Sequence, residues 1–304
     1  MRRALGAGLI LGGFWALWRM NEREKNAVNL RNKVVVITGA ARGIGRETAH
    51  AFGREQSHLL LIDWDAEALA SAQAEVQQYG ERVYTLSIDL TEASAPSEIT
   101  AYALEQFGRI DVLVNNAGLL VSGDFLSHDE AVYRRMFEVN VLAVIRLTRA
   151  VAQVMRDQHS GHIVNVASMA AVLPSIGFSV YGASKGAVRT FSASLRRELR
   201  RDGIMVSSVC PGFVNTQMVG HMTREQMRQA GMLDPLLGLN LIPPYEVADA
   251  IVRAVVYREA EVIVGDRGYH LLALLERLSP RLVDAMFERL IPRDLLLEVS
   301  RYPN

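Results

Sequence analysis

The sequence Lys33-Val-Val-Val-Ile-Thr-Gly39-Ala-Ala-Arg-Gly43-Ile-Gly45 joins an apolar run to a glycine-rich turn, and the helical pattern 46–54 follows. The β-branched run 33–38 predicts a buried parallel strand. Gly39 permits a tight turn, while Gly43 and Gly45 let backbone approach a ligand and let the helix pack on the strand. A helix N-terminus after such a turn binds anions. The stretch therefore predicts a site for the pyrophosphate of a dinucleotide, although its glycine spacing differs from G-x-G-x-x-G.

The rest of the chain alternates strand patterns with helical patterns. Further strands are expected at 58–63, 83–88, 110–114, 162–167, 205–209 and 261–265. Further helices are expected at 66–79, 97–107, 131–156, 181–201 and 244–258. This alternation implies right-handed crossovers between parallel strands. We therefore predict an α/β fold, a Rossmann-like doubly wound parallel sheet, in a single domain.

Two residues make opposite predictions about the dinucleotide. Asp63 ends the second expected strand, where a carboxylate accepts hydrogen bonds from ribose hydroxyls and repels a 2′-phosphate, which favours NAD. Arg42, inside the glycine turn, could meet a 2′-phosphate and would favour NADP. We give Asp63 more weight because its repulsion is direct, so NAD is preferred and NADP stays open. Asp89 follows the third strand and either faces the adenine edge or caps the next turn.

Three residues in the stretch 168–185 suit proton transfer at an alcohol oxygen. Tyr181 and Lys185 are four residues apart, so on a helix their side chains share one face. A cation near a phenol favours the phenolate, which predicts a lowered pKa for Tyr181. Ser168 follows the run 162–167, so it is expected at the carboxyl end of a strand, where ligands bind in open parallel sheets.

The chain resembles the classical short-chain dehydrogenase/reductase family over about residues 32–265. The resemblance is carried in chain order by Thr38-Gly-x-x-x-Gly-x-Gly45, Asn115-Asn-Ala-Gly118, Asn140, Ser168, Tyr181-x-x-x-Lys185 and Pro211-Gly212. It implies that Tyr181 is the general acid/base, that Lys185 lowers its pKa and holds the nicotinamide ribose, and that Ser168 binds the reacting oxygen. Asn140 would help to hold a proton-relay water.

The same resemblance implies the cofactor contacts. The turn from Gly39 to Ile44 would take the pyrophosphate and Asp63 the adenosine ribose. The segment 211–216 would close over the nicotinamide, with Val214 and Thr216 near its carboxamide. The full expected set is Gly39, Arg42, Gly43, Ile44, Gly45, Asp63, Asp89, Leu90, Asn116, Ala117, Gly118, Tyr181, Lys185, Pro211, Gly212, Val214 and Thr216. No metal site is expected.

The amino-acid composition limits the classes of function that this protein could have. The chain has 304 residues, 50% hydrophobic and 22% charged, which indicates a globular protein with a large core. Lys plus Arg and Asp plus Glu number 33 each, so no nucleic-acid partner is indicated. The single cysteine, Cys210, excludes an internal disulfide and is compatible with a reducing compartment. We interpret Cys210 as a buried residue at a strand end.

The N-terminus is a candidate membrane anchor. An uncharged apolar run covers 4–18 between Arg2-Arg3 and the polar segment 19–26, and no small-residue cleavage site follows it. It is shorter than the ~20 residues of a comfortable spanning helix. We therefore expect either a short span or an interfacial helix within residues 1–25, with a soluble helix docked on the domain as the alternative.

The C-terminal third carries the expected substrate elements. Within the domain 26–268, the resemblance implies that the segment 217–242 is the family's variable substrate lid. It contains four methionines, which either suit an irregular apolar space or pack the lid on the core. Val172, Leu173, Ile176 and Phe178 would add apolar wall. The extension 269–304 predicts two amphipathic helices divided at Pro280, which cover either the substrate cleft, a subunit interface or a membrane surface.

The expected function is an enzyme that interconverts a lipophilic alcohol and its ketone or aldehyde, with NAD preferred. Steroid, retinoid and long-chain lipid alcohols are the substrate classes. The alternatives are an NADPH-dependent carbonyl or 3-oxoacyl reductase and, from another class, a cofactor-binding scaffold without turnover. We expect membrane association through residues 4–18 and a catalytic domain on the cytosolic face. The family resemblance implies a homodimer or higher homo-oligomer in which the helices 131–156 and 181–201 pair with their copies.

Overall fold

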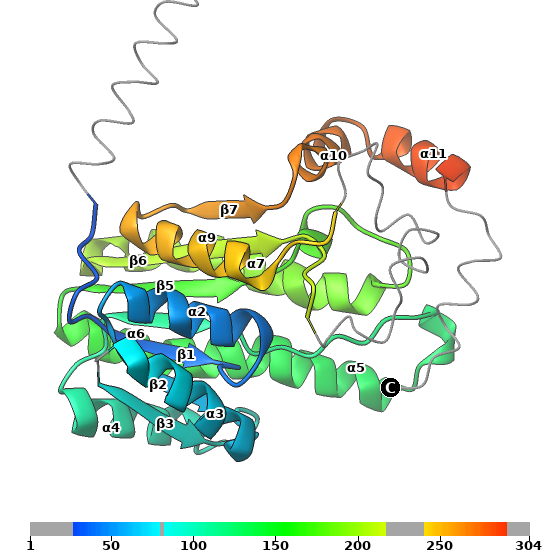
Figure 1. Ribbon diagram of the computed structural model, residues 1–304. Helices are drawn as coiled ribbons and strands as arrows, with labels where there is room; N and C mark the ends of the chain where they lie inside the picture. Colours follow the sequence, from blue (N-terminus) through cyan, green and yellow to red (C-terminus); the bar gives the residue numbers. More distant parts are fainter. Residues whose placement is uncertain (1–26, 80–81, 217–239, 291–304) are drawn as a thin grey trace, which may run out of the picture.

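A computed structural model describes residues 27–79, 82–216 and 240–290. The seven strands form one parallel sheet in the order β3-β2-β1-β4-β5-β6-β7, so the strand order reverses between β1 and β4 (Figure 1). They are β1 (Val34–Thr38), β2 (His58–Asp63), β3 (Val83–Ser87), β4 (Val112–Asn115), β5 (Gly161–Val166), β6 (Ile204–Pro211) and β7 (Glu261–Val264). This arrangement confirms the predicted Rossmann-like doubly wound fold.

Helices cover both faces of the sheet. The α-helices of the described residues are α2 (Gly43–Arg54), α3 (Ala66–Val76), α4 (Ala95–Phe107), α5 (Glu130–Phe137), α6 (Ala143–Asp157), α7 (Ser179–Leu199), α9 (Pro244–Val256), α10 (Arg267–Leu278) and α11 (Pro280–Leu290). Figure 1 shows α2 and α9 side by side against one face, where they contact each other. Helices α4 and α6 pack together on the other face.

The core is divided by the sheet into two layers, because successive strand residues point to opposite faces. In β1, Val35 and Ile37 join the layer beneath α2 and α9, whereas Val36 joins the layer beneath α4 and α6. All three side chains are fully buried. Burial on both faces explains why the strands appear in the sequence as continuous apolar runs.

Most element boundaries agree with the prediction, and two differences have local causes. Strand β4 begins at Val112, because the side chain of Gln158 bonds both backbone groups of Ile110, at 3.0 Å and 2.7 Å. The helix expected at 131–156 is interrupted by a π-helical turn, η3 (Glu138–Leu142), between α5 and α6. Such turns occur often at functional sites, and this one carries Asn140.

The two ends of the chain differ in how far the structure describes them. Helices α10 and α11 are divided at Pro280, as predicted. In the described ranges 27–79, 82–216 and 240–290, no helix is long and apolar enough to cross a membrane. The anchor segment 1–25 lies outside these residues, and so do 217–239 of the expected lid and 291–304 of the extension.

Candidate active site

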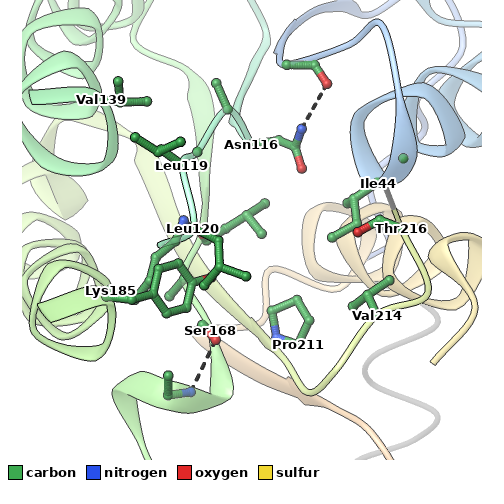
Figure 2. Close-up of a pocket in the computed structure, with 18 of the residues that line it drawn as sticks. Ile44, Asn116, Leu119, Leu120, Val139, Ser168, Lys185, Pro211, Val214 and Thr216 are labelled. Atoms are coloured by element: carbon green, nitrogen blue, oxygen red, sulfur yellow. Dashed lines mark hydrogen bonds between the residues drawn. The ribbon is translucent and has the colours of Figure 1, made fainter. Parts of the chain in front are cut away.

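A cavity of about 920 Å³ opens at the carboxyl ends of the strands. It runs from Arg42, Trp64 and Leu90 at one end to Ser168 and Tyr181 at the other. Its position, where the strand order reverses, is the place at which open α/β sheets bind ligands. Figure 2 shows labelled side chains around an open centre, with Lys185 and Ser168 across from Ile44 and Thr216.

The glycine turn is fastened to the end of β4. Asn116 donates from Nδ2 to the carbonyl oxygens of Thr38 and Gly39, at 3.0 Å and 3.1 Å. Thr38 Oγ1 in return accepts from the backbone N–H groups of Asn116 and Ala117, each at 3.1 Å. These bonds explain why the motifs at 38–45 and 115–118 belong together, because each holds the backbone of the other against the cavity.

Gly45 packs against the glycine turn without lining the cavity. A methyl group at Gly45 would lie 1.9 Å from the Gly39 carbonyl oxygen, so helix and turn pack together only with glycine there. Gly39 and Gly43 have φ of +66° and +54°, a region in which glycine carries no steric penalty. Gly39 and Gly43 line the cavity, but Gly45 does not. Gly45 is thus placed for packing rather than for ligand contact.

Asp63 is held in place at the end of β2. One carboxylate oxygen accepts from Ala41 N at 3.1 Å and the other from Asp65 N at 3.2 Å. The residue lines the cavity beside Trp64, whose ring is 74% exposed. Arg42 also lines the cavity, and its guanidinium bonds the carboxylate of Asp65. Asp63, which favours NAD, and Arg42, which favours NADP, therefore lie at the same end of the cavity.

Asp89 lines the cavity and also caps the turn that follows β3. Its Oδ1 accepts from the backbone N–H and the hydroxyl of Thr91, at 2.9 Å and 2.8 Å, and its Oδ2 pairs with Arg135 at 3.2 Å. These bonds hold the pKa of Asp89 below its ordinary value, with the Thr91 backbone as the largest cause. Leu90 lines the same wall.

Ser168, Tyr181 and Lys185 converge at the far end of the cavity, as the sequence predicted. Ser168 follows β5, and its Oγ accepts from Ala170 N at 3.1 Å. Tyr181 and Lys185 lie one turn apart in α7. Lys185 is buried and donates from Nζ to the Val166 carbonyl oxygen at 2.9 Å. The Ser168 hydroxyl, at the end of β5, and the Tyr181 phenol and Lys185 ammonium, both on α7, therefore lie at the same end of the cavity.

The predicted lowering of the Tyr181 pKa was wrong for this structure. Removal of the phenol from water raises its pKa to about 12, and a hydrogen bond with Ser168 opposes that shift. Burial likewise lowers the pKa of Lys185 to about 8. Both shifts disfavour a charged form, so desolvation sets their direction, not the cation that the four-residue spacing suggested.

Asn140 lies behind the wall of the cavity and is fully buried. Its Oδ1 accepts from Leu119 N at 2.7 Å, and its Nδ2 donates to Leu119 O at 2.9 Å and to Ser184 Oγ at 3.0 Å. These bonds connect η3 to the loop that follows β4 and to α7. The structure therefore places Asn140 so that it positions the segments that carry Gly118 and Lys185.

The segment after β6 forms the remaining wall. Pro211, Gly212, Val214 and Thr216 all line the cavity. A methyl group at Gly212 would lie 2.6 Å from the Tyr269 ring, which is buried against this segment. Tyr269 stands in the first turn of α10 and lines the cavity itself, so the start of the C-terminal extension contributes to the site.

Most of the residues that line the cavity were predicted from the sequence, but several apolar ones were not. Leu173, Ile176 and Phe178 line the cavity as expected, whereas Val172 is buried in the core. The missed apolar or aromatic lining residues are Trp64, Ile88, Leu119, Leu120, Val139, Val166, Ala167, Met169, Ala170, Phe213 and Tyr269. Trp64 adjoins Asp63 and could have been found by position, but no local signal marks Tyr269. Cys210 is fully buried at the end of β6, and burial raises the pKa of its thiol to about 11.

The family model described as short chain dehydrogenase matches residues 33–227. The chain belongs to this family. It is an oxidoreductase that acts on CH–OH groups of small molecules, which favours an enzyme over the scaffold alternative.

Two relatives of this short-chain dehydrogenase align over most of its length. A dehydrogenase/reductase SDR family member 7B of Danio rerio is 32% identical and covers 93% of this chain and 94% of its own. The ketoacyl reductase HetN of Nostoc sp. is 32% identical and covers 85% of this chain and 89% of its own.

Two solved structures share the fold and contain nicotinamide cofactors. A 7α-hydroxysteroid dehydrogenase in complex with NADH and 7-oxo glycochenodeoxycholic acid superposes with a TM-score of 0.73 at 28% identity, covering 79% of this chain and 96% of that one. L-Sorbose reductase from Gluconobacter frateurii, complexed with NADPH and L-sorbose, gives 0.71 at 25% identity, covering 78% and 97%.

The residues of this short-chain dehydrogenase fit a nicotinamide dinucleotide. Glycines stand at four points of the wall, at Gly39, Gly43, Gly118 and Gly212, where backbone rather than side chain faces the cavity. A methyl group at Gly118 would lie 3.3 Å from Lys185 Nζ, so a side chain there would crowd the catalytic end. The cavity also falls within the usual size range of small-molecule and cofactor sites. A nicotinamide cofactor is therefore supported. Of the two related structures, one contains NADH and the other NADPH.

Proposed function

We propose that this protein is an NAD-preferring dehydrogenase of lipophilic alcohols, such as steroid, retinoid or long-chain lipid alcohols. The observation that carries the proposal is the apolar wall beside Ser168 and Tyr181. Leu120 comes from the loop after β4, Leu173 and Phe178 come from the loop between η4 (Met169–Ala171) and α7, and all three line the cavity. A substrate that meets this wall gains by burying apolar surface, at roughly 25 cal/mol per Å².

The chain's own residues supply positioning and proton transfer. Bound nicotinamide dinucleotide would supply the hydride chemistry. Tyr181 would take the proton from the substrate hydroxyl during oxidation and return it to the carbonyl oxygen during reduction. Ser168 would hold that oxygen, since its hydroxyl lies at the carboxyl end of β5 facing the cavity. Lys185 would hold the nicotinamide ribose, and Asn140 would position both catalytic segments.

The preference for NAD rests on Asp63, whose carboxylate is fixed by two backbone N–H groups at the adenosine end. A second candidate, an NADPH-dependent carbonyl or 3-oxoacyl reductase, is favoured by Arg42 in the cavity wall and by the ketoacyl and L-sorbose reductases among the comparisons. The burial-raised pKa of Tyr181 keeps the phenol protonated at neutral pH, which suits a proton donor in carbonyl reduction.

One panel experiment tests both candidates. The full chain in detergent is offered steroid, retinoid and long-chain alcohols with NAD or NADP, and matched carbonyls with NADH or NADPH. We expect turnover of a lipophilic alcohol class with higher kcat/KM for NAD. Turnover confined to carbonyls with NADPH would replace the first candidate with the second.

Tyr181→Phe tests the chemical assignment. Its turnover should fall by at least roughly 100-fold, the scale on which a general acid/base contributes, while the Kd for cofactor stays unchanged. Tyr245→Phe, at an exposed tyrosine of α9, is the matched control and should keep full activity. Unchanged turnover in Tyr181→Phe would remove this phenol from the mechanism.

We also propose that residues 4–18 attach the protein to a membrane, with the catalytic domain on the cytosolic face. The uncharged apolar sequence supports this attachment, together with a substrate class that partitions into lipid. Extraction of membranes with alkaline carbonate should leave the full chain in the pellet, and recovery in the supernatant would contradict an integral anchor. The homo-oligomer predicted from the family resemblance stays a prediction, which sedimentation in detergent would test.

A further inference from the structure

Arg42 stands at the adenosine end of the cavity with its side chain turned to a partner. It is the last residue before Gly43, and its guanidinium Nη2 bonds Asp65 Oδ2. Arg42 lines the cavity, while Asp65 is not among the lining residues of the described chain. The arginine is therefore drawn toward a carboxylate outside the space in which a ligand would lie.

Asp65 is the fixed member of this pair. Its Oδ1 accepts from Ala68 N at 3.0 Å and caps α3, and its backbone N–H donates to Asp63 Oδ1 at 3.2 Å. The bond from Ala68, followed by Arg42, holds the pKa of Asp65 below its ordinary value, so the carboxylate stays ionised at neutral pH. Arg42 is the more exposed member, with 49% of its side chain accessible against 20% for Asp65.

A second arginine–carboxylate pair stands at the neighbouring wall, where both members line the cavity. Arg135, the other arginine among the described lining residues, pairs with Asp89 at 3.2 Å. Both arginines of the wall are thus matched by carboxylates, and Asp63 stands beside Arg42 with its own negative charge. A 2′-phosphate at this end would meet a carboxylate directly and would find each nearby guanidinium already bonded.

We propose that Asp65 is a cofactor-selectivity residue, which withholds Arg42 from a 2′-phosphate and leaves the repulsion from Asp63 unopposed. The proposal rests on the proposed function, because it explains how NAD preference survives an arginine in the glycine turn. Asp65 acts through Arg42 and is a positioning residue. Loss of its charge frees the guanidinium to pair with phosphate, a geometry that arginine favours.

The test is the binding of NAD and of NADP to the full chain in detergent, measured by calorimetry. Asp65→Asn keeps a good N-cap and removes the charge. Because partly exposed ion pairs contribute little, we expect its Kd for NADP to fall by about 2- to 5-fold while its Kd for NAD stays the same. Asp65→Ser, which also caps helices, is the second variant should the first fail to fold.

Two comparisons make this test specific. In an Arg42→Ala background, Asp65→Asn should leave the Kd for NADP unchanged, because the double-mutant cycle isolates the coupling between the two residues. Asp249→Asn, which removes the exposed partner of Arg54 at 3.3 Å, is the charge-matched control and should change neither Kd.

The outcomes separate this proposal from the proposed function. An unchanged Kd for NADP in Asp65→Asn, or an equal fall in the Arg42→Ala background, would overturn the selectivity role and leave Asp65 as a helix cap. Tighter binding of NADP than of NAD by the unmodified chain would instead refute the NAD preference. The ratio of Kd values between the variants would still decide the role of Asp65.

Discussion

His162 is expected to make the stability of this protein depend on pH. The residue lies in β5 with 5% exposure, and its Nε2 is 2.7 Å from Ser207 Oγ. The Ser207 hydroxyl donates to the Glu259 carbonyl oxygen, so we assign the Nε2–H of a neutral imidazole as the donor to Ser207. Burial, with a smaller contribution from Arg258, lowers the pKa of His162 from 6.5 to about 3.

The sign of the effect follows from which state binds the proton. The unfolded chain protonates His162 below pH 6.5, but the folded protein does so only near pH 3, so stability is lost as pH falls through this window. Linkage gives a loss of about 2 kcal/mol between pH 7 and pH 5 from this residue. The figure at pH 5 changes little if the folded pKa is one unit higher, since the folded imidazole is still neutral there.

The measurement is the free energy of unfolding from urea titrations at pH 7 and pH 5 for the full chain in detergent. His162→Gln keeps an amide donor near Ser207 and cannot titrate, so its stability should fall by about 2 kcal/mol less than that of the unmodified protein. His270→Gln, at an exposed position of α10, is the matched control and should behave like the unmodified protein. An equal pH dependence in His162→Gln would refute the argument.

Three further predictions concern the turn, the core and the extension. Gly45→Ala should raise the Kd for NAD at least roughly 10-fold with the fold retained, because its methyl group would displace the Gly39 carbonyl at 1.9 Å; Gly186→Ala, which meets nothing within 4 Å, should leave this Kd unchanged in calorimetry. Asn165→Ala should cost about 1–3 kcal/mol in urea unfolding, since it strips two buried side-chain partners. Tyr269→Ala should cost about 3–5 kcal/mol in the same assay and raise the KM for cofactor, because this buried ring supports the wall after β6.

The fold was predictable because its strands are buried on both faces and therefore appear as apolar runs in the sequence. Strand β2 was predicted at its observed ends, 58–63, and Asp63 at its terminus follows directly. Parallel strands then bring their carboxyl ends to one edge, so Ser168 and the glycine turn had to lie near each other. The structure brings these residues together, while their chemical roles stay predictions.

Contacts between distant segments were not predictable in the same way. Tyr269 reaches the wall because α10 follows β7, the strand that pairs with β6, and its ring packs against Gly212, 57 positions earlier. The π-helical turn at 138–142 has no composition that distinguishes it from the α-helices on either side. The side chain of Gln158 bonds the backbone N–H and carbonyl of Ile110, which lies 48 positions earlier. Each depends on the assembled sheet rather than on local pattern.

The pKa of Tyr181 shows why proximity in sequence does not fix electrostatics. For an unburied tyrosine and lysine the reference pKa values are nearly equal, about 10 and 10.4, so proton transfer between them would be almost neutral in energy. In the folded protein burial moves the two pKa values apart, to about 12 and about 8, and so favours the uncharged pair. The spacing of four residues determines only that the two side chains share a face. The sign of the shift comes from burial, to which neighbours such as Phe178 contribute, whose ring centroid lies 6.3 Å from that of Tyr181. A phenolate at this position therefore has to be stabilised by charge or hydrogen bonds at the phenol itself, and Ser168 is the described residue that provides such a bond.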